Sequence, residues 1–297
     1  MSSQTPDTLE TPPALAARYR FEAVLGKGAQ ATTYRATRLD DQRSVAVKQL
    51  SVAQIESWKA LELFEREAKL LRRLDVPQVP KCLDYVVDDR PDGTRFYLVQ
   101  DFVDGRNAAS LLAEQGAFTE PEVRELARQV ATLFAALHSR QPPVVHRDVK
   151  PSNFMRDEAG RWWLIDFGAA SARGGSDGST VAGTFGFMAP EQFRGRASPA
   201  SDYYGLGATL AQLLSGVHPS DFEAEALRLQ IRPHVHASEP LLALIEALLE
   251  PDEKQRLCDP DQLRSALEAT DEADPELDDD ALVPADPADY RVLEERT

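Results

Sequence analysis

The segment His146–Asn153 carries three side chains that could act together on a phosphate group. The Asp148 carboxylate can accept a proton from a hydroxyl, and the Lys150 ammonium can neutralise a migrating phosphoryl group. The amide oxygen of Asn153 can bind a hard cation such as Mg²⁺, which prefers oxygen ligands. Asp166 follows thirteen residues later, after an apolar run, and is a second candidate ligand. One aspartate alone could be a loop carboxylate with no role, but this order and spacing favour a reactive site.

A second group lies in the first third of the chain. In the expected strand 44–50, Ala46 and Lys48 project from the same face, because side chains alternate along a strand. Ala46 leaves room for a flat base and Lys48 can reach phosphates, although a lone lysine on a half-buried strand is more often a surface residue. Glu67 falls inside the apolar stripe of the expected helix 57–74, and a buried carboxylate needs a cation. We expect Lys48 to be that cation, unless Glu67 lies at the edge of the stripe and reaches water.

The turn between the first two expected strands contains Gly26, Lys27, Gly28 and then Ala31. Glycine lets backbone amides approach a phosphate with no side chain in the way. A plain hairpin turn explains the same residues equally well. A dinucleotide-binding loop is disfavoured, because a strand rather than a helix follows. The turn therefore supports a phosphate site only together with the other two groups.

The remaining pattern divides the chain into a part with short strands and one helix, and a mostly helical part over 107–269. The expected strands are 19–26, 32–38, 44–50, 81–88 and 95–102. Thr119 and Glu122 have the spacing of a capping box and mark the start of a helix. The stretches 202–216 and 240–250 are apolar on nearly all sides, so interior helices are expected there.

Composition narrows the class of protein. The chain has 297 residues, 42% of them hydrophobic, and a net charge of −16, which argues against binding to nucleic acid or anionic membranes. The chain has only two cysteines, Cys82 and Cys258, and they lack a metal-ligand spacing. Structural disulfides are therefore not expected, which fits a reducing cytoplasm. No stretch predicts a secretion signal or a membrane segment.

Charge and composition also change at both ends. We expect a flexible lead-in over residues 1–17 and one domain over 18–270. The segment 271–297 carries −9 of the net charge and is expected to be a disordered acidic tail.

Taken together and in order, these motifs resemble those of the eukaryotic-type (Hanks-type) serine/threonine protein kinases, most closely the bacterial ones. The resemblance covers about residues 19–269. The motifs that carry it are Gly26 and Gly28, Val45–Lys48, Glu67, His146–Asn153, Asp166–Gly168, Gly183–Glu191, Asp202 and Arg256. It implies an α+β, two-lobed fold, with a small lobe of five antiparallel strands and one helix over 18–103. A larger, mostly helical lobe would follow over 104–270, and ATP would bind between the lobes.

The resemblance implies how ATP would be held. Lys48 would hold the α- and β-phosphates, with Glu67 orienting the lysine. Gln100 would be the gatekeeper of a hinge over 98–103 that binds adenine through its backbone. The cofactor-binding residues would be Leu25, Gly26, Lys27, Gly28, Ala46, Lys48, Asp101, Val103 and Met155.

For the chemical step, the resemblance implies that Asn153 and Asp166 bind Mg²⁺. Asp148 would position the acceptor hydroxyl and take its proton. Lys150 is typical of the serine/threonine type, and Thr184 would lie near it on the acceptor side.

Scaffold and regulatory roles also follow from the resemblance. Glu191 and Arg256 would form an ion pair, and Asp202 would accept hydrogen bonds from amides of the catalytic loop. Arg147 would pair with a phosphate on the activation segment. The candidate phosphorylation sites are Ser176, Ser179 and Thr180. The alternative is a loop whose serines only keep it solvated.

The expected function is ATP- and Mg²⁺-dependent phosphorylation of serine or threonine in protein substrates, with autophosphorylation. The main alternative is a pseudokinase scaffold that binds nucleotide without phosphoryl transfer, although such proteins usually lack at least one of the residues above. A small-molecule kinase would usually lack the segment Gly183–Glu191, and a pure binding module would not need Asn153. The oligomeric state and the physiological substrate do not follow from the sequence.

Overall fold

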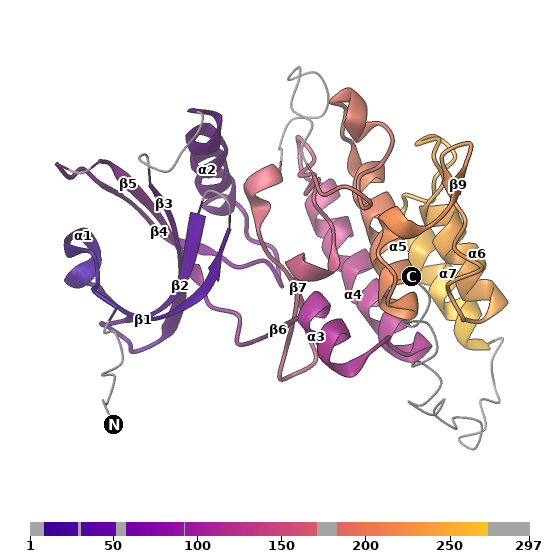
Figure 1. Ribbon diagram of the computed structural model, residues 1–297, viewed down its shortest axis with the longest axis horizontal. Coiled ribbons are helices and arrows are strands. Elements are labelled where there is room, and N and C mark those ends of the chain that lie inside the picture. Colours follow the sequence, from indigo (N-terminus) through magenta and orange to yellow (C-terminus); the bar gives the residue numbers. More distant parts are fainter. Residues whose placement is uncertain (1–8, 29–30, 52–57, 92, 171–182, 273–297) are drawn as a thin grey trace, which may run out of the picture.

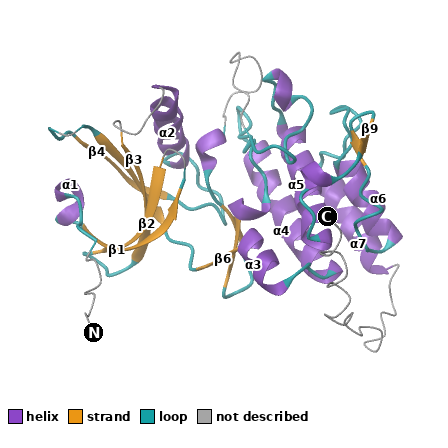
Figure 2. Ribbon diagram, in the orientation of Figure 1, coloured by secondary structure: helices purple, strands orange, loops and turns teal. Residues whose placement is uncertain are grey.

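The computed structural model describes residues 9–28, 31–51, 58–91, 93–170 and 183–272. Figure 1 shows these residues as two lobes that follow each other along the chain. The smaller lobe contains a five-stranded antiparallel sheet and the helix α2 (Trp58–Leu71), whereas helices dominate the larger lobe (Figure 2). The predicted α+β, two-lobed fold is therefore confirmed.

The sheet of the small lobe has the strand order β1-β2-β3-β5-β4. Its strands are β1 (Tyr19–Lys27), β2 (Ala31–Arg38), β3 (Ser44–Ser51), β4 (Cys82–Asp88) and β5 (Arg95–Asp101). Each end lies within one residue of the range predicted from the sequence. The agreement follows from period-two patterns that are bounded by turn residues.

The two faces of β3 have different environments. Val45 and Val47 are almost fully buried on one face, where Tyr97 of β5 packs against them. Ala46 and Lys48 point to the other face, because successive side chains of a strand alternate. β3 therefore presents the two residues singled out in the sequence to the cavity between the lobes.

Within the predicted flexible lead-in over residues 1–17, the described residues 9–17 are packed against the sheet. Residues 13–16 form the short helix α1 (Pro13–Ala16), and Leu15 is fully buried against Tyr19 and the valine face of β3. The Thr11 hydroxyl oxygen also accepts a hydrogen bond from the backbone of Phe21 at 2.9 Å. Leu15, with Leu9 packed against the same cluster and the Thr11 hydrogen bond, holds this segment against the sheet. Such a short proline-containing stretch has no periodic pattern from which its packing could be predicted. Residues 1–8 and the predicted acidic tail from 273 onwards lie outside the described residues.

The main helices of the large lobe are α3 (Ala108–Gln115), α4 (Glu120–His138), α5 (Pro199–Ser215), α6 (Glu239–Leu248) and α7 (Pro260–Glu272). The predicted capping box precedes α4, where the Thr119 amide donates to the Glu122 carboxylate at 2.9 Å. The short strands of this lobe are β6 (Gly105–Asn107), β7 (Phe154–Asp157), β8 (Trp162–Leu164), β9 (Ala224–Glu225) and β10 (Arg228–Leu229). None of the helices in the described ranges is both long and apolar enough to span a bilayer.

α5 is the central support of the candidate site. Almost all of its residues are buried, as predicted for an interior helix. A Cβ atom on Gly205 would lie only 2.9 Å from the carbonyl oxygen of Val149. Glycine at this position therefore allows the loop that carries Asp148 to rest directly on the backbone of α5.

Candidate active site

A cavity of about 590 Å³ lies between the lobes and is lined by residues of both. Most of the predicted site residues line it: Leu25, Gly26, Ala46, Lys48, Glu67, Asp101, Val103, Lys150, Asn153, Met155 and Asp166. Asp148 is not a lining residue but contacts Lys150 and Asn153, which are. Lys27 and Gly28 do not line the cavity either. They lie where β1 meets the following turn, and the Gly28 amide donates to the Ala31 carbonyl at 2.8 Å, as in a plain hairpin.

Three charged side chains meet on the small-lobe side of this cavity. The Lys48 ammonium donates to the Glu67 carboxylate at 2.8 and 3.1 Å, and to Asp166 Oδ1 at 2.8 Å. Glu67 is only 2% exposed and lies in the stripe of α2 that also buries Phe64 and Leu71. The predicted pair is therefore formed, and Asp166 is a second partner of the lysine that the sequence did not indicate.

The electrostatics of this cluster fix its charge state. Burial alone would favour the neutral amine, but the carboxylates of Glu67 and Asp166 outweigh it and raise the pKa of Lys48. The Lys48 charge in turn lowers the pKa of Asp166 to about 2, against the opposing effect of burial. Lys48 is therefore cationic and Asp166 anionic at neutral pH.

The backbone at Asp166 is held in an uncommon conformation. Asp166 has φ 62° and ψ 74°, in the left-handed region that aspartate tolerates better than most residues. A Cβ on Gly168 would lie 3.3 Å from Asp166 Oδ1 and 3.4 Å from Glu67 Oε2. A glycine two residues after Asp166 therefore leaves the space in which the three charged groups meet.

A second polar cluster surrounds Asp148. Its Oδ2 lies 2.8 Å from the Lys150 ammonium, and its Oδ1 accepts a hydrogen bond from the Thr184 hydroxyl at 2.8 Å. Lys150 also donates to Thr184 Oγ1 at 2.6 Å. The side-chain nitrogen of Asn153 donates to the Asp148 carbonyl at 2.8 Å and to its carboxylate at 3.2 Å. The Asp148 carboxylate thus already accepts a hydrogen bond from an alcohol, with a cation beside it.

Asp202 of α5 holds the backbone of the two residues that precede Asp148. Its two carboxylate oxygens each accept a backbone amide at 2.8 Å, one from His146 and one from Arg147. His138, at the end of α4, contacts the same carboxylate at 2.9 Å. Arg147 has φ 72°, a conformation that costs about 1–3 kcal/mol in a residue other than glycine. Asp202 has the predicted scaffold role, and these bonds help to hold the strained backbone.

The two clusters belong to one site. The Ile165 amide donates to the Asn153 carbonyl at 2.9 Å, which joins the segment before Asp166 to the loop after Asp148. Asn153 and Asp166 line the same cavity, and Asp148 contacts two of its lining residues. The nitrogen of the Asn153 amide is used by Asp148, so its oxygen is the atom left to bind a cation.

This donor set fits Mg²⁺. The ion prefers oxygen and usually keeps waters and phosphate oxygens beside one or two protein ligands. Among the residues that the structure describes, no group of three or more His, Cys, Asp or Glu side chains could hold a metal. The amide oxygen of Asn153 and the anionic carboxylate of Asp166 are oxygen ligands of the kind that Mg²⁺ takes together with phosphate oxygens.

The segment predicted as the hinge, 98–103, is held by contacts with Lys81 and Arg35. The Asp101 carboxylate accepts a hydrogen bond from the Lys81 amide at 3.1 Å, and the Asp101 amide donates to the Lys81 carbonyl at 3.0 Å. The guanidinium of Arg35 lies over the Phe102 ring, 5.0 Å from its centroid. Gln100, the predicted gatekeeper, pairs with Ala46 of β3 and lines the cavity.

The sequence did not indicate every lining residue. Those missed include Thr33, Arg106, Asn107, Ser110 and Ile165. A signal existed for Asn107, whose side chain accepts the Ser110 amide at 2.8 Å and caps α3. Thr33 and Ile165 reach the cavity only through tertiary packing, for which no local pattern exists.

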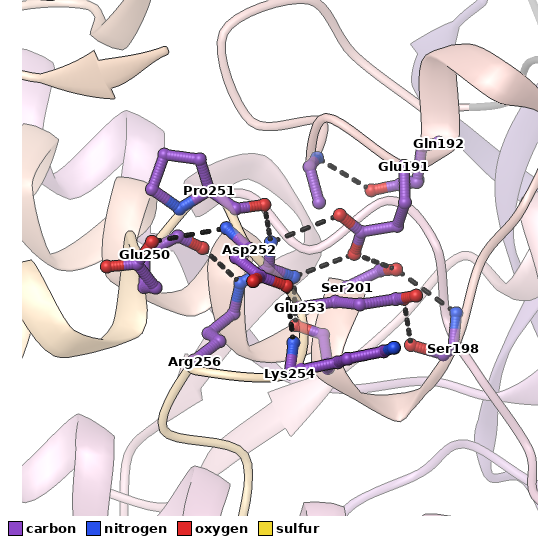
Figure 3. Close-up of polar contacts among 12 residues, drawn as sticks. Glu191, Gln192, Ser198, Ser201, Glu250, Pro251, Asp252, Glu253, Lys254 and Arg256 are labelled. Carbon is purple, nitrogen blue, oxygen red and sulfur yellow. Dashed lines mark hydrogen bonds and ion pairs between the residues drawn. The ribbon is translucent and has the colours of Figure 1, made fainter. Parts of the chain in front are cut away.

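Glu191 and Arg256 form the predicted ion pair, deep in the large lobe (Figure 3). Two hydrogen bonds of 2.7 and 3.1 Å join the guanidinium to the carboxylate. The Arg256 guanidinium also donates to three backbone carbonyls, those of Ala200, Glu250 and Pro251. The candidate phosphorylation sites Ser176, Ser179 and Thr180 lie outside the described residues.

Comparison with known proteins agrees with this geometry. The protein kinase domain family matches residues 19–268, so the chain belongs to the protein kinase family. Similar proteins include serine/threonine-protein kinases F and B of Synechocystis sp., each 34% identical, over 277 and 271 residues. Serine/threonine-protein kinase PrkC of Bacillus subtilis is 30% identical over 230 residues.

These relatives are longer than the present chain. The three matches cover 85%, 84% and 76% of this chain, but only 55%, 46% and 34% of the respective relatives. The chain thus spans about half the length of the first two. The resemblance to bacterial eukaryotic-type kinases that the motifs predicted is confirmed.

Proposed function

We propose that this protein transfers the terminal phosphoryl group of ATP to serine and threonine hydroxyls of protein substrates, with Mg²⁺ as cofactor. The observation that carries this proposal is the Asp148 carboxylate, which accepts a hydrogen bond from an alcohol while Lys150 lies beside both groups. An acceptor hydroxyl that replaced Thr184 in this arrangement would meet a base and a cation together.

The cavity supports ATP as the phosphoryl donor. Its volume is in the general range of small-molecule and cofactor pockets, roughly 300–1,000 Å³. Its lining combines apolar side chains, among them Leu25, Ala46 and Met155, with the Lys48 cation. Adenine would lie against the apolar residues and the 101–103 backbone, with the phosphates near Lys48.

Each residue of the site has a distinct part in the proposed reaction. Lys48, oriented by Glu67, would bind phosphate oxygens, and Asn153 and Asp166 would hold the metal ion, which would supply positive charge beside the phosphates. Asp148 orients the acceptor hydroxyl and takes its proton. Lys150 stabilises the charge on the phosphoryl group as it moves to the acceptor.

The decisive experiment is transfer of labelled phosphate from ATP, with Mg²⁺, to a generic protein substrate. The parent protein should label serine or threonine. Asp148→Ala should lower the rate by about 10²–10⁴-fold, as for loss of a general base. Asp261→Ala, on the surface of α7, is the matched control and should keep the parent rate. Equal rates in Asp148→Ala and the parent would refute the role of Asp148.

We also propose autophosphorylation at Ser179 or Thr180. Burial and the nearby Arg66 of α2 lower the pKa of Arg147, which means that they disfavour its charged form. A phosphate dianion beside Arg147 would stabilise that charged guanidinium. Mass spectrometry of protein incubated with ATP should find phosphate within residues 171–184. An unmodified segment after full substrate turnover would contradict this proposal.

The surface beside Thr184 supports an apolar contact with the substrate. Phe185 and Phe193 are 68% and 50% exposed, and their rings pack edge to face with centroids 6.4 Å apart. A substrate side chain next to the acceptor hydroxyl would cover these rings. Peptides with leucine or phenylalanine beside the acceptor should have a lower KM than peptides with glycine, and Phe185→Ser should remove the difference.

The proposed catalytic domain is 18–270, divided between residues 103 and 104, and the family match over 19–268 supports it. We further propose that it acts in the cytoplasm on protein rather than nucleic acid. The net charge of −16 and the two free thiols, Cys82 and Cys258, support this.

A further inference from the structure

Gln192 joins the two segments that meet at Asp148, and neither the sequence motifs nor the proposed reaction gives it a role. Its side-chain nitrogen donates to the carbonyl oxygen of Arg147 at 2.8 Å. Its side-chain oxygen accepts the backbone amide of Ala189 at 3.0 Å (Figure 3). Gln192 is only 4% exposed, so both bonds are shielded from water.

The bond to Arg147 acts on the peptide group that leads into Asp148. The amides of His146 and Arg147 are held by Asp202, and the Arg147 carbonyl is held by Gln192. Arg147 itself has φ 72°, a conformation that persists only where surrounding contacts impose it. Asp202 and Gln192 therefore hold Arg147 from its two sides, and Gln192 fixes the plane of the Arg147–Asp148 peptide.

The same contact reaches the segment that carries Thr184. A Cβ on Gly183 would lie 2.9 Å from the Arg147 carbonyl oxygen and 3.3 Å from the Gln192 side-chain nitrogen. Gly183 has φ +132°, and Thr184 follows it and bonds to the Asp148 carboxylate. The position of Gln192 therefore affects the Asp148 carboxylate in two ways. One is through the Arg147 carbonyl of the preceding peptide, and the other is through Thr184, which bonds to the carboxylate.

We propose that Gln192 is a positioning residue that sets the orientation of the Asp148 carboxylate by anchoring the Arg147 carbonyl to the segment 183–191. This inference rests on the proposed function, because Asp148 is the group that it orients. Only a side chain with both a donor and an acceptor can make the two bonds at once. Ionised glutamate could still accept from Ala189 but would place an anion against the Arg147 carbonyl. Methionine has a similar length and would make neither bond.

The test compares Gln192→Glu and Gln192→Met with the parent in steady-state phosphate transfer. Both variants should lower kcat by about tenfold or more, because a displacement near 1 Å at the reacting groups can cost up to about 10²-fold. The KM for ATP should stay within about twofold, since Gln192 does not line the nucleotide cavity. Gln230→Glu is the matched control, because Gln230 also donates to a backbone carbonyl, that of Arg228, but on the surface. It should keep the parent kcat.

Hydrogen exchange followed by mass spectrometry gives a readout that does not depend on activity. Both Gln192 variants should speed exchange of the His146 and Arg147 amides, but only Gln192→Met should speed exchange at Ala189. A kcat within twofold of the parent in both variants, or a fall in kcat matched by a fall in ATP affinity, would overturn the proposal. If the parent transfers no phosphate, the proposed function fails, and unchanged exchange at residues 146 and 147 would then overturn this inference separately.

Discussion

Two buried cation–carboxylate pairs in this protein are alike in chemistry and opposite in surroundings. In the large lobe, every N–H of the Arg256 guanidinium is used, by Glu191 and by three backbone carbonyls. At the cavity, Lys48 bonds to Glu67 and to a second carboxylate, that of Asp166. Lys48 also lines the cavity between the lobes. We call Arg256–Glu191 the closed pair and Lys48–Glu67 the open pair. The closed pair can only hold the fold, whereas the lysine of the open pair can exchange a carboxylate for a phosphate.

The largest expected effect is on stability at the closed pair. Arg256→Met should lower the free energy of unfolding by about 3–5 kcal/mol, because it leaves the buried Glu191 carboxylate without its cation. Urea denaturation measures this loss, and kcat of the protein that remains folded should be close to that of the parent. Arg264→Met removes an exposed pair with Asp261 and should cost less than about 1 kcal/mol. If Arg256→Met and Arg264→Met lower the free energy of unfolding by the same small amount, the closed pair does not stabilise the large lobe.

At the open pair the expected effect is on turnover. Lys48→Met should lower kcat by about 10²–10³-fold, the usual cost of removing one preorganised charge from a reacting centre. The double variant Lys48→Met/Glu67→Leu should regain stability, because no buried carboxylate is left unpaired, but it should not regain turnover. Lys69→Met, which removes an exposed pair on α2, is the control for both assays. Recovered turnover in the double variant would show that Lys48 serves stability alone.

A smaller effect is expected from Gly168→Ala. The added methyl would press on Asp166 Oδ1 and Glu67 Oε2, each less than 3.5 Å away. A displacement of part of an ångström should lower kcat about tenfold, below the limit of about 10²-fold for a 1 Å shift. Thermal unfolding should change little. An unchanged kcat would mean that the three-group cluster tolerates movement.

The smallest effect concerns pH. The pKa of Asp166 is lowered to about 2, chiefly by the Lys48 charge, from an ordinary value near 3.9. A lowered pKa means that the ionised form stabilises the fold above about pH 4, and that this contribution is lost as pH falls toward 2. The difference in Tm between the parent and Asp166→Asn should therefore be constant above about pH 5 and shrink in more acidic buffer. A difference that grows on acidification would reverse the assigned sign.

Most of the fold could be predicted from the sequence, because strand alternation and helical stripes are local patterns. The pairing of Lys48 with Glu67 also followed from a local observation, a carboxylate placed inside an apolar stripe. The docking of Leu15, the contact between Lys48 and Asp166, and the two bonds of Gln192 could not be predicted. Each of these depends on segments that meet only in the folded chain, and none leaves a periodic signal.

The strained backbone at Arg147 and Asp166 was equally inaccessible to sequence reasoning. An arginine or an aspartate in the sequence does not predict a positive φ in the way that a glycine can. At Arg147, the backbone is held by Asp202, which is distant in sequence.

We propose that the open pair and the Asp148 cluster form one site for ATP and Mg²⁺. A crystal structure with Mg²⁺ and a non-hydrolysable ATP analogue tests it most directly. The metal should lie on the Asn153 oxygen and the Asp166 carboxylate, with phosphate oxygens within hydrogen-bond distance of Lys48. Nucleotide bound outside the inter-lobe cavity, or a metal held by neither residue, would contradict it.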